Sequence, residues 1–345
     1  MSQTFYSGAG AKLAAGLQDN YFANGSTNVT TKLNITSATF DPSVEKISEE
    51  TLLQSKVKNG SLLASISVDG SFDANLRPEM TDWVFSAACQ QLSTTQSSTT
   101  ISGEDYDINQ YELKAAGNDP LGSTLVLTRA DTTVDVYTYP GMTARSMTMT
   151  MPNNDFVTVS MDLAGREEIK AGATSRITTN GAHTGGSTYV TRDDESVDFT
   201  KSSYIVTKGV FKWNDVMWCI ESSTLTIDNG IEDSPRCYQD GQFANIPVMG
   251  MRSVTFDFNL PYDLKIEDLK NQYLFTSQYG EAEVTFTNAD DENEKVVVLI
   301  PNLSITSVGA GISGTGVVEA SVSGEAVQAN GAEPLVITVQ TKHVE

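Results

Sequence analysis

The chain has 345 residues, with 22 lysine and arginine residues against 44 aspartate and glutamate residues, a formal net charge of −22. This balance disfavours an attractive nucleic-acid surface, because phosphate contacts need lysine and arginine; the simplest role of the charge is to keep the protein soluble. The length predicts two domains of about 150 residues. The start lacks a signal-peptide pattern, and no apolar run approaches the roughly 18 residues of a membrane span.

Residues 1–31 are rich in glycine, alanine and asparagine and have no apolar period. This composition predicts an extended N-terminal arm with little core of its own, either unstructured or ordered by a neighbouring subunit. We expect a first β domain over residues 32–170, a linker over 171–200 and a second β domain over 201–345.

The same succession of elements occurs twice and begins with an alternating strand. Residues 68–76 and 254–260 place apolar side chains on one face and polar ones on the other, and both contain Phe-Asp-x-Asn-Leu. A period of two over this length predicts a half-buried antiparallel strand. Pro78 and Pro261 end these strands, and helical spacing of apolar residues then predicts one short helix in each half. A repeat of this length indicates two copies of one domain, which suits a ring subunit better than a catalyst.

Two hairpins follow each expected helix. The first spans residues 124–139 in one half and 283–300 in the other, and the second agrees between the halves at an offset of 161 without a gap. The stretch 91–119 has no counterpart in the second half. Because it is rich in serine, threonine and glycine, it is predicted to be a protruding loop.

The return strand of the second hairpin carries polar side chains at every second position in both halves. These faces cannot be core, because burying an unpaired carboxylate costs on the order of several kcal/mol or more. They must face solvent, a neighbouring subunit or a channel. The candidate channel-lining or interface residues are Thr158, Ser160, Asp162, Glu319, Ser321 and Ser323.

No motif supports catalysis, and we expect neither an enzymatic activity nor a cofactor. Residues 309–314 match the dinucleotide-binding pattern, but that pattern needs a helix after it, and a strand-like sequence follows here. The two histidines, His183 and His343, lie in polar segments without an orienting partner.

Metal and glycan sites are weaker interpretations than structural ones. Acidic runs at 193–195, 232–233 and 290–292 offer oxygens for calcium but lack the spacing of a calcium loop, so solvated turns are favoured. Trp213 and Trp218 could form a carbohydrate platform, although Phe211, Trp213 and Met217 are more simply interpreted as the inward residues of a strand. The cysteines are too widely spaced to predict a disulfide framework or a zinc site: Cys89, Cys219 and Cys237.

The order of elements resembles that of phage tail tube proteins, the major tail proteins of long-tailed phages. A glycine-rich arm precedes a strand, then Phe-Asp-x-Asn-Leu before proline, a short helix and two hairpins; residues 223–230 through 254–256 are especially similar to that family. The resemblance implies a mainly β chain. It would hold two tandem antiparallel β-sandwich or barrel domains of the tail-tube type, each with one short flanking α-helix.

The resemblance also implies a structural virion protein that assembles with itself and with other tail proteins into stacked rings. The usual ring holds six single domains, so a duplicated chain implies three chains per ring with pseudo-sixfold symmetry. A channel wall of serine, threonine, aspartate and glutamate would let genome DNA pass without specific binding. The expected location is the phage tail, after synthesis in the host bacterial cytoplasm, with no membrane partner.

One alternative from another class stays open. A tandem β-sandwich that binds a glycan or another protein would show the same alternating strands and the same lack of catalytic motifs. Microscopy of the purified protein separates the two, because a tube subunit forms hollow rings or tubes of uniform width and a binding module stays dispersed.

Overall fold

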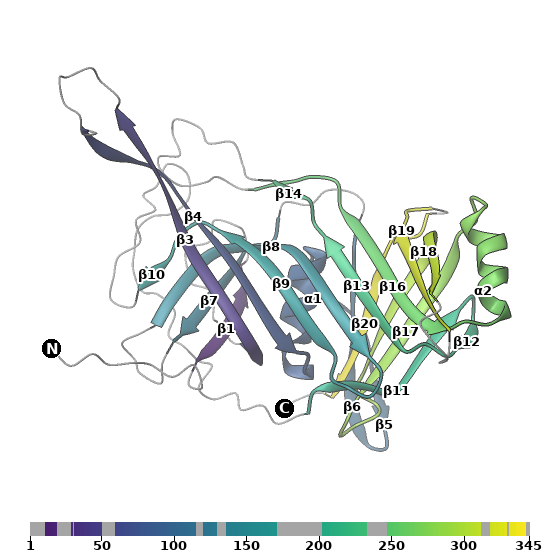
Figure 1. Cartoon of the computed structure of the whole chain (residues 1–345). Helices are drawn as coiled ribbons and strands as arrows, with labels where there is room; N and C mark the ends of the chain where they lie inside the picture. Colours follow the sequence, from purple (N-terminus) through teal and green to yellow (C-terminus); the bar gives the residue numbers. More distant parts are fainter. Residues whose placement is uncertain are drawn as a thin grey trace.

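A computed structural model describes residues 11–18, 29, 31–49, 59–114, 120–129, 136–170, 202–232, 247–311, 318–329 and 331–342. Antiparallel strands dominate this part of the chain, and its α-helices are the short α1 (Thr81–Cys89) and α2 (Leu264–Leu269) (Figure 1). The expected mainly β fold with short flanking helices is therefore confirmed. The expected linker at residues 171–200 lies outside the described residues.

The first half of the chain contributes the strands β1 (Lys12–Leu17), β2 (Thr31–Leu33), β3 (Ile35–Glu49), β4 (Asn59–Asn75), β7 (Ser123–Thr128), β8 (Val136–Pro152), β9 (Thr158–Gly165) and β10 (Ile169–Lys170). Six of them neighbour one another in the order β1, β7, β8, β9, β4 and β3. Of the remaining two, β2 pairs with β1 at one end of this run, and β10 pairs with the first part of β8. α1 packs against β1 and β8.

The second half contributes β11 (Tyr204–Trp213), β12 (Val216–Trp218), β13 (Ser222–Asp228), β14 (Ile231–Glu232), β15 (Val248–Met249), β16 (Ser253–Pro261), β17 (Gly280–Asn288), β18 (Lys295–Gly311), β19 (Glu319–Ala326) and β20 (Val336–Lys342). Its main strands follow the same order as the first half, namely β11, β17, β18, β19, β16 and β13. A helical turn (Lys270–Leu274) continues from α2 and contacts β18, as α1 contacts β8.

The long strands β8 and β18 show the duplication most directly. Each has 17 residues and belongs to two hairpins, first with β7 or β17 and then with β9 or β19. Both carry a one-residue bulge opposite the second partner, at Arg145 in β8 and at Thr306 in β18. These two bulges are separated by the same offset of 161 that relates the hairpins. We therefore call the halves copy one and copy two.

The Phe-Asp-x-Asn-Leu repeat is displaced by two residues between the copies. Phe72 lies opposite Met161 of β9, whereas Phe258, rather than Phe256, lies opposite Val322, the counterpart of Met161. A shift of two residues keeps every side chain on its own face of a sheet. Phe72 and Phe256 are accordingly both buried, at 1% and 0% exposure, in neighbouring rather than equivalent positions.

The two copies join through β8 and β13, which pair from Ser222 opposite Pro152 to Asp228 opposite Ser146. This joint creates one continuous antiparallel sheet of eight strands in the order β3, β4, β9, β8, β13, β16, β19 and β18. In Figure 1 the sheet runs from β3 and β4 at one end of the molecule to β19 and β18 at the other.

The described part of stretch 91–119 is not the expected protruding loop. It folds into a hairpin of β5 (Thr94–Ile101) and β6 (Glu104–Glu112), and β6 pairs with β20 of copy two. The Tyr106 hydroxyl donates to Asp291 Oδ2 at 2.7 Å, which ties the hairpin to an acidic turn of copy two. Serine and threonine suit a solvated strand as well as a loop, so composition alone misassigned this stretch.

Residues 12–17 differ from the expected arm without a core. β1 lies between β2 and β7, and Leu13 and Ala15 are fully buried in the main core. Because the middle of the strand is buried on both faces, it has no polar–apolar alternation that would reveal it in the sequence. The domain boundaries near residues 32, 170 and 201 stay predictions.

Candidate channel-lining face

One face of the eight-stranded sheet is polar across both copies, and we call it the polar face. Directly opposed residues of neighbouring antiparallel strands point to the same side, so the register assigns side chains to this face. Its central row is Ser37, Asp73, Ser160, Thr148, Thr226, Thr255, Glu325 and Ser304. The flanking rows are Thr39, Ser71, Asp162, Ser146, Asp228 and Ser253 on one side, and Asn75, Thr158, Thr150, Thr224, Asp257, Ser323 and Ser307 on the other. The same alternation extends the face to Asp41, Asp69, Ser222, Asn259, Ser321 and Glu319.

All six residues singled out in the sequence lie on the polar face. Five of their side chains are exposed, and that of Ser323 is half-buried. β9 and β19, which carry them, are separated by β8, β13 and β16 in the sheet, and the tertiary structure turns both sets to the same side. Their role in lining a channel stays a prediction. The six are Thr158, Ser160, Asp162, Glu319, Ser321 and Ser323.

Sequence reasoning missed the part of the face carried by β3, β8 and β13. The signal was present, because Thr148 and Thr150 alternate with buried methionines, and Thr224 and Thr226 alternate with buried aliphatic residues. A threonine at every second position is a weaker indication of a solvated face than a carboxylate, since threonine is also tolerated inside a sheet.

The polar face is anionic. Arg145 adds a positive charge at the β8 bulge, and its Nη1 lies 2.6 Å from Asp69 Oδ1. Ser37 Oγ donates to Asp73 Oδ2 at 2.6 Å, and hydrogen bonds from Ser37 and Ser160 hold the pKa of Asp73 below its usual value. Carboxylates thus dominate the charge of the face at neutral pH. They belong to Asp41, Asp69, Asp73, Asp162, Asp228, Asp257, Glu319 and Glu325.

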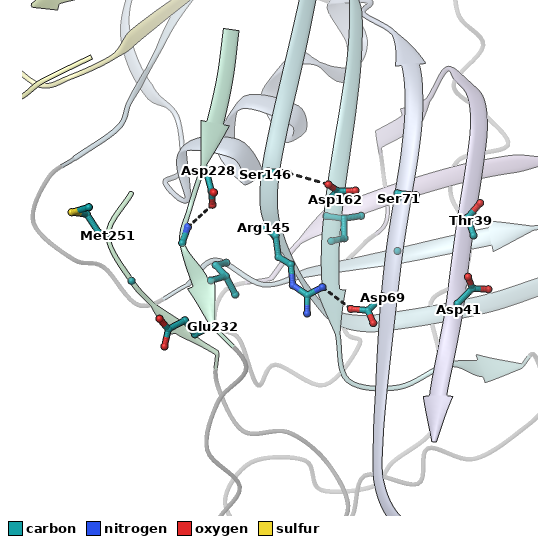
Figure 2. A pocket seen from close by; sticks show the side chains of 15 residues that line it. Thr39, Asp41, Asp69, Ser71, Arg145, Ser146, Asp162, Asp228, Glu232 and Met251 are labelled. Carbon is teal, nitrogen blue, oxygen red and sulfur yellow. Dashed lines mark hydrogen bonds and ion pairs between the residues drawn. The ribbon is translucent and has the colours of Figure 1, made fainter. Parts of the chain in front are cut away.

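A hollow of about 730 Å³ lies on the polar face where the two copies meet. Figure 2 shows Arg145 directed at Asp69 on one side of it and Asp228 on the copy-two side. Ser146 Oγ donates to Asp162 Oδ2 at 3.2 Å across this hollow's floor. Thr306 occupies the bulge of copy two, so the guanidinium of Arg145 has no counterpart there.

The other candidate chemistries have structural explanations where the chain is described. Gly309 lies inside β18, paired with β19, which is not the strand-to-helix turn of a dinucleotide site. Asp290 Oδ2 accepts from the Ser202 amide and Asp291 Oδ2 from the Tyr106 hydroxyl, so both carboxylates order a turn. His183 and His343 lie outside the described residues.

The described ranges hold neither a metal-binding cluster nor a membrane-spanning helix. Among these residues, no group of three or more His, Cys, Asp or Glu side chains could hold a metal ion. No helix within the same ranges is long and apolar enough to cross a membrane.

The tryptophans of copy two belong to an aromatic cluster rather than a platform. Trp213 is 4% exposed and packs against Phe258, Trp218 and Tyr273 at centroid distances of 6.5, 6.2 and 5.2 Å. Met217 is exposed instead of pointing inward. The interpretation of Trp213 as a core residue of a strand is therefore confirmed, whereas that of Met217 is wrong.

The fold and the polar face together define a structural β protein, with a duplicated antiparallel sheet and one large anionic surface. Comparison with known families gives the particular class. The chain belongs to the phage tail tube protein family, whose model matches residues 8–326. It is therefore a structural component of a phage tail. A search of curated proteins found no match.

Proposed function

We propose that this protein assembles with itself into stacked rings that form the tail tube, and that the polar face lines the channel for genome DNA. The observation that carries the proposal is that a single anionic face extends over both copies of the sheet in a chain of the tail tube family. The proposed lining includes Thr158, Ser160 and Asp162 of copy one and Glu319, Ser321 and Ser323 of copy two.

Three chains complete each ring in this proposal, because each chain supplies two copies of the domain in place of two single-domain subunits. The joint between β8 and β13 then recurs around the ring with pseudo-sixfold symmetry. Other tail proteins meet the two ends of the stack, where ring-to-ring contacts are missing.

The chemistry of the polar face suits a conduit. Carboxylates repel the DNA phosphates, and this repulsion is felt within a Debye length of about 8–10 Å at cellular ionic strength. Serine and threonine hydroxyls keep the wall hydrated without adding positive charge. DNA is therefore not retained by the counterion release that drives its binding to basic surfaces.

Electron microscopy of the purified protein tests the proposal. Negative stain should show hollow tubes or rings of uniform width, and a cryo-microscopy map should place the six lining residues on the channel wall. Dispersed monomers across protein and salt concentrations would instead favour a tandem β-sandwich binding module. A channel wall that is apolar, or ringed by lysine and arginine, would refute the conduit even if rings form.

A further inference from the structure

The joint inside the chain offers a template for the contact between chains. β13 covers the outer edge of β8, and the Asn229 amide after it donates to Arg145 O at 2.8 Å. The Asn229 side chain is fully buried, and its Nδ2 donates to Ala88 O at the end of α1 and to Ala144 O on β8. Arg252 adds a bond from Nη2 to Cys89 O at 3.1 Å. The hairpin that contains β13 and β16 thus clamps both β8 and α1 of copy one.

The corresponding edge of copy two is uncovered. Residues 304–311 of β18 pair with β19 on one side, and no described strand pairs with the other side. Met147 and Met149 of β8 are fully buried beside β13. Their counterparts at the offset of 161 are half-buried Val308 and exposed Ala310.

The helical segment beside this edge is also exposed. α1 buries eight of its nine residues, partly under β6 and partly under the β13–β16 hairpin. The turn Lys270–Leu274, which contacts β18, buries none of its residues, and Phe275 after it is 75% exposed. Copy two therefore presents a strand edge and an adjoining apolar surface together.

β3 is the strand of copy one that matches β13. Residues 37–41 read Ser-Ala-Thr-Phe-Asp, and residues 224–228 of β13 read Thr-Leu-Thr-Ile-Asp. Both strands form a hairpin with the next strand of the sheet, β3 with β4 and β13 with β16. No described strand pairs with the outer edge of β3, and a groove of about 690 Å³ runs along it between β3 and Leu127 and Arg129.

We propose that β3 of a second copy of this chain docks on the open edge of β18, with its hairpin beside the turn Lys270–Leu274. The inference rests on the proposed ring and names its interface. The two open edges lie at opposite ends of the eight-stranded sheet, so the contact is head-to-tail and closes when the rotation per chain completes a circle (Figure 1). Open strand edges are templates for such pairing, which repeats the backbone hydrogen bonds of a sheet.

The internal joint also gives the register. Thr226 lies opposite Thr148, with their hydroxyl oxygens 3.4 Å apart. Thr226 lies opposite Thr255, and Thr255 lies opposite Glu325, which corresponds to Ala164 at the offset of 161. Ala164 lies opposite Asp69, and Asp69 lies opposite Asp41, so Asp41 is the counterpart of Thr226 once the slide of two residues is included. Gly309 is the counterpart of Thr148. Asp41 of one chain should therefore lie opposite Gly309 of the next.

Disulfide cross-linking tests this register, in a background with Cys219 and Cys237 replaced by serine. The double variant Asp41→Cys/Gly309→Cys should give covalent dimers and trimers on a non-reducing gel after mild oxidation of the assembled protein. A side chain at position 309 meets Ser321 Oγ at 3.2 Å, a hydroxyl that can rotate away. Each single variant should stay monomeric on the gel, and Thr148→Cys/Thr226→Cys should form an internal disulfide as the positive control.

The outcomes separate this inference from the proposed function. Rings in the microscope without covalent dimers, while the internal control oxidises, would overturn the docking of β3 on β18 and leave the tube intact. Cross-linking of Thr39→Cys with Gly309→Cys in place of Asp41→Cys would overturn the register. A wild-type protein that forms no rings under any condition would refute the proposed function, and the interface with it.

A second variant tests the interface without engineered cysteines. Ala310 is exposed in the isolated chain, so Ala310→Lys should keep the melting temperature of the monomer. The lysine should abolish ring formation, because docking would bury its charge. Ala289→Lys, a matched change at another exposed alanine, should assemble normally. Normal rings from Ala310→Lys would contradict the proposed interface.

Discussion

At the scale of single residues, large aromatic side chains are buried beneath the polar face in both copies. Phe72 and Phe256 are buried on the inner side of β4 and β16. Phe72 packs on Trp83 of α1 at a centroid distance of 6.0 Å, and Phe256 packs on Phe211 at 6.1 Å. Each copy thus has its own aromatic centre under the same polar surface.

Replacing either phenylalanine by alanine should reduce the free energy of unfolding by about 3–5 kcal/mol, the range for large aromatic deletions in packed cores. Urea denaturation of the isolated chain measures this change. Phe275→Ala is the matched control, because Phe275 is 75% exposed and should change the free energy by no more than about 0.5 kcal/mol. A loss at Phe72 as small as that of the control would show that its contacts are misassigned.

Asp73 reports on the hydrogen bonding of the polar face. Ser37 and Ser160 lower its pKa, so the double variant Ser37→Ala/Ser160→Ala should raise it. A carboxylate with a depressed folded pKa adds stability above its unfolded pKa and loses it as the pH falls through the folded value. The wild type should therefore lose more stability than the variant on acidification below about pH 4. NMR titration of the Asp73 carboxyl checks the shift, and an unchanged pKa in the variant would contradict the assignment.

At the scale of elements, β1 belongs to the first copy of the domain rather than to a free arm. Its residues 12–17 pair with β7 on one side, and with β2 on the other. Removing this strand would leave the β7 edge open and uncover the core around Leu125 and Leu127, which are buried in the complete chain.

If residues 1–31 were only an arm without a core, their deletion would leave a folded protein. With β1 in the sheet, this deletion should instead destabilise copy one strongly. Leu13→Ala alone should reduce the free energy of unfolding by about 2–5 kcal/mol, the range for a buried leucine. Circular dichroism during denaturation tests both changes, with deletion of residues 1–10, which keeps β1, as the control. A fully stable 1–31 deletion would show that β1 contributes little to the core.

The β5–β6 hairpin ties the copies through Tyr106. Its hydrogen bond to Asp291 is the main cause that raises the pKa of Tyr106 to about 12. A group whose folded pKa is raised adds stability below its unfolded pKa, about 10 for tyrosine, and loses it as the pH rises through the folded value. The melting temperature of the wild type should therefore fall more steeply with pH than that of Tyr106→Phe between about pH 10 and 12. Tyr279→Phe, a change at an exposed tyrosine, should show the same pH dependence of the melting temperature as the wild type. The same dependence in Tyr106→Phe would contradict a stabilising hydrogen bond between Tyr106 and Asp291.

At the scale of the whole molecule, the charge of the polar face sets how an assembled tube would treat DNA. Asp162 and Asp257 are exposed on this face, one in each copy. Asp162→Lys/Asp257→Lys should leave assembly intact and make tubes retain DNA at low salt, with release as salt rises. Co-sedimentation of tubes with labelled DNA measures retention. Asp105→Lys/Asp268→Lys, the same charge change off the polar face, should retain none; equal retention by both variants would indicate adsorption outside the channel.

The sequence by itself determined the alternating strands, their buried faces and the duplication, because these depend on local periods. Val254, Phe256 and Phe258 alternate with polar residues, and such a period of two identifies a half-buried strand wherever it lies in the fold. The same alternation turned all six candidate residues to the polar side of β9 and β19.

Only the tertiary structure decided which strands meet. A slide of two residues between β4 and β9 relative to β16 and β19 preserves every face, so no local pattern records it. β1 shows no alternation in the sequence because both its faces are buried. The β5–β6 hairpin forms strands in a polar sequence because β6 pairs with β20. The continuous polar face exists because β13 pairs with β8, a contact between distant segments whose free energy comes from backbone hydrogen bonds and packing that form only when the chain is folded.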